Sequence, residues 1–102
     1  MKVLTKDHKY ELANFEGTGV QTIQFIEKHK NPVEGDALIT INDGTTNEEV
    51  LAMLIDRTQG LHNKFPSRES AIAITKMQEA LLWLNERTRE RKVRKVEGKH
   101  LA

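Results

Sequence analysis

Cysteine is absent from the 102 residues, so the fold has no disulfide framework and no thiolate ligand for a metal ion. Long apolar runs are absent too, since no stretch approaches the roughly 18–20 apolar residues that a membrane-spanning helix needs. The N-terminal stretch MKVLTKDHKYE lacks the apolar segment of a secretory signal peptide. These absences favour a protein of a reducing cytosol that neither crosses a membrane nor is secreted.

Familiar catalytic motifs are also missing. There is no P-loop, no G-x-G-x-x-G and no G-x-S-x-G motif. Serine occurs only at Ser67 and Ser70, and no histidine is placed by the sequence to activate either one. The histidines have neither HExxH spacing nor cysteine partners for a metal, and they are scattered along the chain at His8, His29, His62 and His100. The sequence therefore predicts a binding protein that is not an enzyme and that holds no metal or cofactor.

The first part of the chain has the pattern of short strands. Residues 1–7 form either a frayed start or a short edge strand, and residues 9–15 read as a strand with Tyr10 and Leu12 on one face. Turn residues at 16–19 join them to an alternating stretch at 20–28, for which a short helix is the alternative. A further strand is expected at 37–41. These segments predict an antiparallel β-meander over residues 1–43.

The second part of the chain has the pattern of two amphipathic helices. Thr46 and Glu49 form a capping box, from which a helix is expected to run to about Leu61. Its apolar stripe would consist of Val50, Leu51, Leu54, Ile55 and Leu61. Pro66 ends the turn, and a second helix begins near Ser67 or Arg68 with the core stripe Ile74, Met77, Leu81 and Leu84, flanked by Ile72.

Two helices joined by a short turn form an antiparallel hairpin. The sequence therefore predicts an α+β protein with a small N-terminal antiparallel sheet and a C-terminal helical hairpin. We expect a single domain over residues 1–102, divided into the meander at 1–43 and the hairpin with its basic tail at 44–102.

The end of the chain is strongly basic although the net charge of the whole protein is only +1. Residues 87–99 carry an excess of about five positive charges, a local concentration that suits an anionic partner. The second helix leads into this region along one face, through Trp83, Arg87, Arg91 and Arg94. A guanidinium group can donate two parallel hydrogen bonds to the oxygens of a phosphate, and an aromatic ring can stack on a nucleobase. This face is therefore a candidate nucleotide site.

A purely structural interpretation stands beside that hypothesis. Basic residues at a helix C-terminus are favoured by the helix dipole without any ligand, and Trp83 would then pack against the sheet or a second subunit. A third interpretation is a nucleic-acid-binding module that uses the basic tail, for which binding would fall steeply with salt.

Four other residues are also open to either a structural or a ligand-binding interpretation. Phe65 either fills the core or stacks on a ligand, and Arg68 opens the second helix, where a cation needs an acidic partner or a ligand. Arg57 is by default a solvent-exposed residue of the first helix. Asn47 stands at the start of that helix, where backbone amides favour anions.

Four segments together resemble a known family. They are DGTTNEEVLAMLIDR at 43–57, KFPSRES at 64–70, AITKMQEALLWL at 73–84 and RTRERKVRKVEGKH at 87–100. They are similar to the phage Thoeris anti-defence sponge proteins, whose helical hairpin is shared with the anti-CBASS sponges of cyclic nucleotides. The segments KYELANFE and IQFIEK resemble the Thoeris-type members specifically. The resemblance covers nearly the whole chain.

This resemblance implies a homo-oligomer, from dimer to hexamer, in the cytoplasm of an infected bacterial host. It implies that the protein sequesters glycocyclic ADP-ribose intact, so that the Thoeris effector is not activated, and some relatives also hold cyclic di- or trinucleotides elsewhere. The ligand would lie between subunits. By position, phosphates would be bound by Arg87, Arg91 and Arg94 and a base by Phe65 and Trp83, with Arg57, Arg68 and Asn47 as further contacts.

One departure from the family pattern is visible at the end of the chain. The family ending is nearer RGVEG, whereas this chain has a lysine, Lys95, in place of the glycine. The turn and the helix end at this point are therefore expected to differ from those of the family.

Overall fold

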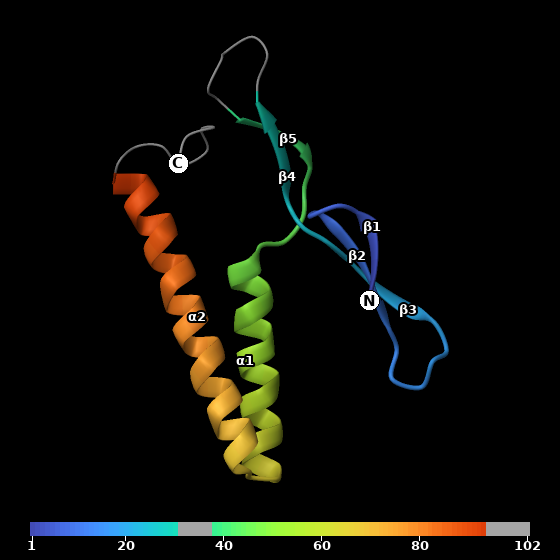
Figure 1. The fold of residues 1–102 in the computed structure, drawn as a ribbon, viewed down its shortest axis with the longest axis vertical. Coiled ribbons are helices and arrows are strands. Elements are labelled where there is room, and N and C mark those ends of the chain that lie inside the picture. The colour runs from blue at the N-terminus through green and yellow to red at the C-terminus, as the bar shows by residue number, and fades with distance from the viewer. Residues whose placement is uncertain (31–37, 94–102) are drawn as a thin grey trace. The chain divides into compact units, whose positions relative to one another are not determined.

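The computed structural model describes residues 1–30 and 38–93 (Figure 1). The chain forms two compact units, an all-β unit over Met1–Thr46 and a helical unit from Asn47 onward. The predicted α+β class is confirmed. The expectation of a single domain stays a prediction.

The first sheet has three antiparallel strands in the order β1-β2-β3. They are β1 (Lys2–Thr5), β2 (Lys9–Ala13) and β3 (Val20–Gln24). In the register of β2 and β3, Tyr10 lies opposite Ile23. The turn expected between them is present, and its two glycines have the positive φ angles, 76° and 102°, for which glycine is suited.

The expectation of a single meander is wrong, because β4 (Glu27–Lys30) and β5 (Leu38–Asn42) form a second, separate antiparallel sheet. The stretch 20–28, expected to be one strand, is interrupted at Phe25 and Ile26. Thr45 forms an isolated parallel bridge with Phe25. The Ile26 N–H donates to the Thr45 carbonyl at 2.9 Å. The chain thus changes hydrogen-bonding partners at this point and starts a new sheet.

At this junction between the two sheets, the backbone at Gly44 lies very close to that of Gln24 and Phe25. A Cβ atom at position 44 would lie 2.7 Å from the carbonyl carbon of Phe25 and 2.8 Å from that of Gln24. The Thr45 N–H donates to the Gln24 carbonyl at 2.9 Å, which holds the two backbones together. Tyr10 packs edge-on against the Phe25 ring at 5.8 Å between centroids. Only glycine fits at position 44 without backbone movement.

The two predicted helices are present as α1 (Asn47–Lys64) and α2 (Arg68–Val93). Helix α1 begins directly after Thr46, as the capping box predicts, but it continues past Gly60 to Lys64. Ser67 caps α2, because its hydroxyl oxygen accepts the Ser70 N–H at 3.0 Å. In the part of the chain that the structure describes, no helix is long and apolar enough to cross a membrane.

The helices meet along a seam of residues spaced alternately three and four apart, the repeat of a two-helix coiled coil. Ile74 is buried at 6% exposure, and its neighbours in the seam are half-buried. The seam of α2 comprises Ser70, Ile74, Met77, Leu81, Leu84, Thr88 and Arg91, and that of α1 comprises Glu48, Leu51, Ile55, Thr58 and His62.

The predicted stripe of α2 is confirmed as this seam. The predicted stripe of α1 is wrong at Leu54 and Leu61, which are 39% and 45% exposed. The half-buried seam positions in this part of α1 are instead occupied by two polar residues, Thr58 and His62.

A matched pair of glycine substitutions tests the junction. Gly44→Ala should lower the free energy of unfolding by about 1–3 kcal/mol, because the added methyl group meets backbone that must move. Gly60→Ala, which meets nothing within 4 Å and lies in a helix, should raise it by about 0.5–1 kcal/mol. Urea unfolding followed by circular dichroism measures both, and a neutral Gly44→Ala variant would contradict the tight junction.

Candidate ligand site on the helical hairpin

Helix α2 continues beyond the start of α1 (Figure 1). The hydrogen bond between His62 and Ser70 across the turn sets the antiparallel register. Asn47, the first residue of α1, is 15 residues before His62, and Asn85 is 15 residues after Ser70, so Asn47 and Asn85 lie at the same height along the hairpin. The last eight residues of α2, 86–93, therefore extend about 12 Å past the first residue of α1, given 1.5 Å per residue.

Trp83 lies just before this extension and points away from the seam. Its side chain is 75% exposed, and the neighbouring Leu82 is 69% exposed. With Glu79 and Glu86 they line a shallow groove of about 300 Å³. Within the helical unit the ring therefore lies outside the packed seam. Its packing against the sheet or a second subunit and its stacking on a ligand stay predictions.

The arginines of the extension differ in what they can do. Arg87, one turn after Trp83, is exposed. Arg89 is held by Glu86, with its Nε 3.0 Å from one carboxylate oxygen and its second terminal nitrogen 2.6 Å from the other. This two-pronged contact lowers the pKa of Glu86 and raises that of Arg89. The Arg89 guanidinium is therefore already paired with the Glu86 carboxylate.

Arg91 is closer to the seam than the sequence pattern suggested. It is half-buried and continues the row of Leu84 and Thr88, and its Nε is shielded from solvent. Arg87 and Arg91 are still one turn apart, so both guanidinium groups can reach one anion beside the extension. Arg94 lies outside the described residues.

The remaining candidates are exposed and belong to different places on the hairpin. Phe65, which is 78% exposed, and Arg68 lie at the turn between the helices. Asn47 lies at the opposite end, and Arg57 lies midway along α1. The 18 residues of α1 span about 27 Å. One hairpin therefore separates Phe65 and Arg68 from Trp83 and the arginines by most of its length.

The turn also carries a histidine–serine contact that the sequence analysis missed. His62 Nδ1 is hydrogen-bonded to the Ser70 hydroxyl, and the Ser67 N–H donates to the same nitrogen at 3.5 Å. The spacing of these residues in the sequence does not reveal this contact. Folding the chain at Pro66 brings the residues together across eight positions of sequence. Because Ser67 and Ser70 also cap α2, the contact links the end of α1 to the start of α2 and stabilises the turn between them.

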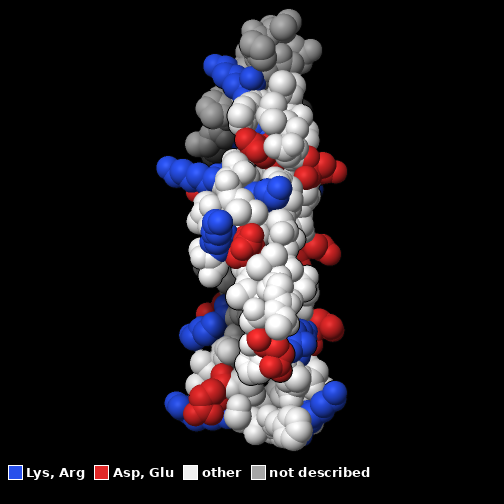
Figure 2. Space-filling view, turned by 90° about the vertical axis from the view of Figure 1, so that its right-hand side faces the viewer, with Lys and Arg blue, Asp and Glu red and all other residues white. Residues whose placement is uncertain are grey.

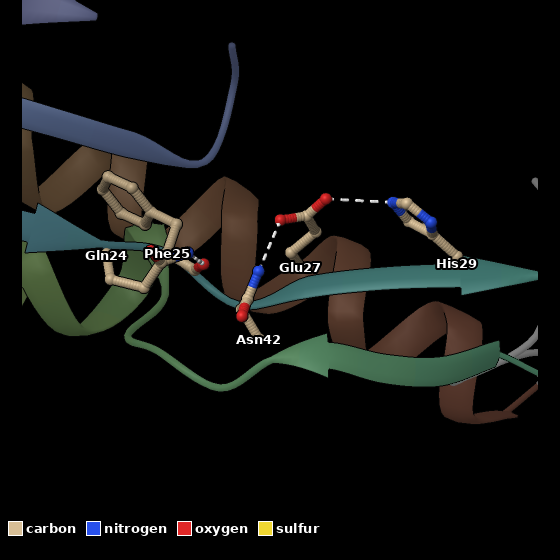
Figure 3. A network of polar contacts seen from close by, with 5 residues as sticks. All are labelled: Gln24, Phe25, Glu27, His29 and Asn42. Atoms are coloured by element: carbon tan, nitrogen blue, oxygen red, sulfur yellow. Dashed lines mark hydrogen bonds and ion pairs between the residues drawn. The ribbon is translucent and has the colours of Figure 1, made fainter. Parts of the chain in front are cut away.

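The second sheet contains a polar network around Glu27 (Figure 3). Asn42 Nδ2 donates to one carboxylate oxygen of Glu27 at 3.0 Å, and His29 Nε2 lies 3.0 Å from the other. The Asn42 hydrogen bond is the largest cause of a lowered pKa for Glu27, and His29 adds to it. A lowered pKa keeps this carboxylate ionised, so Glu27 is suited to joining β4 and β5 and not to donating a proton.

The described ranges 1–30 and 38–93 contain no group of three or more histidine, aspartate or glutamate side chains placed to hold a metal ion. On the face shown in Figure 2, lysine and arginine side chains are interspersed with aspartate and glutamate. That face has no continuous basic surface of the kind that binds a nucleic-acid backbone.

The fold and these residues define a small α+β protein whose antiparallel helical hairpin carries an exposed tryptophan and arginines beyond the packed seam. The family model for the Acb2/Tad1 hairpin domain matches residues 22–89, which is 68 of the 102 residues. The chain belongs to this family.

A relative named Thoeris anti-defense 1, from Bacillus phage SBSphiJ7, is 54% identical over 59 residues. The match covers 57% of this chain and 42% of the relative, so the chain spans less than half the length of that protein. The resemblance to the Thoeris anti-defence proteins that the sequence predicted is confirmed.

The Glu27 network makes a prediction for acid solution. Because the folded-state pKa of Glu27 lies below its ordinary value of 4.5, the network stabilises the fold above that pH and loses its contribution as the pH falls through the lowered pKa. Asn42→Ala should raise the Glu27 pKa towards 4.5, and His29→Ala should raise it as well. Carboxyl-carbon NMR titration measures both, and an unchanged pKa in Asn42→Ala would contradict the assigned cause.

Proposed function

We propose that this protein is a phage anti-defence sponge, which binds the Thoeris signal glycocyclic ADP-ribose and releases it unchanged. Support comes from membership of the hairpin family and from the similarity to Thoeris anti-defense 1. A sponge acts by mass action in the cytoplasm of the infected cell. It therefore needs a dissociation constant well below the concentration of the signal, and no catalytic residue.

The observation that carries this proposal is the face of α2 from Trp83 to Arg91. Trp83 offers an exposed ring for stacking on the adenine base. Arg87, and Arg91 one turn later, offer paired donors for the two phosphates of an ADP-ribose. Arg94, outside the described residues, is a further candidate by its spacing in the sequence alone. An anion here also relieves the repulsion between neighbouring guanidinium groups.

The spread of the other candidates supports a site shared between copies. Phe65 and Arg68 lie too far along the hairpin to reach a ligand at Trp83 of the same chain. A second copy packed antiparallel to the first would bring its own turn towards that end. A homo-oligomer, dimer or hexamer, therefore completes the site, with Arg57 and Asn47 as further contacts and with cyclic di- or trinucleotides as a second ligand class.

The alternative function, a nucleic-acid-binding module, is less well supported by the charges. Among the described residues, Arg89 is paired with Glu86, and acidic side chains are interspersed with basic ones on the face in Figure 2. A polymer binder would show affinity for DNA or RNA that falls steeply with salt, because each phosphate contact releases counterions. A sponge would bind the cyclic nucleotide and leave the polymer unbound in a gel-shift experiment at low salt.

Two arginines separated by one residue provide a sharp test. Arg87→Ala should weaken the binding of glycocyclic ADP-ribose by about 1–3 kcal/mol, the cost of removing a charged hydrogen bond. Arg89→Ala is the matched control, because its guanidinium is already paired with Glu86, and it should change the affinity much less. Titration calorimetry measures both, and equal losses in the two variants would indicate a general charge effect and contradict the assigned site.

The fate of the ligand separates a sponge from an enzyme. The protein is incubated with glycocyclic ADP-ribose, filtered, and then denatured by heat. Chromatography of the released fraction should recover the molecule unchanged and in the bound amount. A cleaved product in that fraction would show that the protein is a hydrolase and would overturn the proposed mechanism.

A further inference from the structure

The loop between β2 and β3 presents a phenylalanine that no contact among the described residues explains. The Phe15 side chain is fully exposed, at 101%. The backbone that carries it is nonetheless well fixed. The Gly17 N–H donates to the Asn14 carbonyl at 3.0 Å, and the Asn14 N–H donates to the Gly19 carbonyl at 3.2 Å.

The side chain of Asn14 fixes the same loop further. Its Nδ2 donates to the Thr18 carbonyl at 3.0 Å, and its Oδ1 accepts from Gln21 at 2.9 Å. Gly17, with φ of 76°, takes the turn conformation that other residues resist. An aromatic ring on a pre-ordered loop loses little conformational entropy when it is buried, which is the property of an interface anchor.

A groove on α2 matches this anchor in size and chemistry. It lies on the outer side of the helix, away from the seam, and has a volume of about 420 Å³. Its lining residues are Ala71, Ile72, Thr75 and Lys76. Ile72 is 41% exposed, and the Thr75 hydroxyl donates to the Ala71 carbonyl at 3.2 Å. Two of these lining side chains, Ala71 and Ile72, are therefore apolar, and the Thr75 hydroxyl already has a hydrogen-bond partner.

We propose that Phe15 of one copy of this chain inserts into the groove of a second copy between Ile72 and Lys76. Charge decides between this groove and the one beside Trp83. Glu16 follows Phe15, so a groove with Lys76 at its edge attracts the loop, whereas the described residues that line the other groove include no lysine or arginine. Lys76 is able to change partner, because its contact with Glu79 is long, at 4.0 Å, and solvent-exposed.

This contact goes beyond the proposed function and rests only on its oligomer. It assigns a role to the β unit, which would join one copy to the helical unit of the next. It also leaves Trp83, Arg87 and Arg91 open for the proposed ligand. Because the contact joins two different surfaces, it can close as a two-fold pair of identical contacts or as a ring.

Charge reversal tests the contact in the full chain. Phe15→Ala should weaken self-association at least about tenfold, as expected for an aromatic anchor. Glu16→Lys and Lys76→Glu should each weaken it, and the double variant should restore most of the loss. Met53→Ala, which removes an apolar side chain that is 54% exposed on α1, is the control and should leave association unchanged. Sedimentation equilibrium measures all of these variants, and calorimetry with glycocyclic ADP-ribose is run on the same samples.

A disulfide test uses the absence of native cysteine. Glu16→Cys protein mixed with Lys76→Cys protein should form a mixed disulfide faster than Glu16→Cys mixed with Met53→Cys. Unchanged association in Phe15→Ala, no rescue by the double variant, or a monomeric native protein would each overturn the contact. Ligand binding that persists in those cases would leave the sponge function standing, so the two failures are distinguishable.

Discussion

The seam between α1 and α2 is the interaction on which the rest of the hairpin depends. In the described residues only Ile74 is buried, and the rows beside it are half-buried. A fully buried aliphatic side chain contributes about 1.5–3 kcal/mol, so the margin of stability from this one row is small. The turn must therefore be set by specific contacts, which His62, Ser67 and Ser70 supply. Their hydrogen bonds fix the register, and the register decides which part of α2 extends beyond α1.

Within the helical unit, α2 packs against α1 along one side, the seam, and its second side lies outside that contact. In α2 that side carries Ile72, Leu82 and Trp83, all well exposed. Such side chains in a small protein are characteristic of association or ligand binding. Their two grooves differ in charge, one edged by a lysine and one by two glutamates. The lysine at the first groove is the physical basis for proposing a second copy there. The ligand proposed beside Trp83 would instead have its phosphates bound by Arg87 and Arg91.

The sequence predicted the helical half well because its signals are local. Thr46, Pro66 and Ser67 mark helix ends through their own backbone chemistry, and the stripe from Ile74 to Leu84 follows from the helical repeat. The break at Phe25 was missed because the alternation of residues 20–28 continues through it. The break depends on Thr45, twenty positions away, and on Gly44, which no pattern of neighbours reveals. The contact between His62 and Ser70 was missed for the same reason, since it exists only once the turn has formed.

The candidate site shows where sequence reasoning reaches its limit in physical terms. Trp83 and Arg87 could be placed on one exposed face by counting residues, and their exposure agrees. Counting could not separate Arg89 from Arg87, because the pairing with Glu86 depends on side-chain geometry. It also placed Phe65 and Trp83 in one site although most of a helix lies between them. A ligand that contacted both residues, as proposed, would have to lie between two copies, because one hairpin separates the two side chains by most of its length.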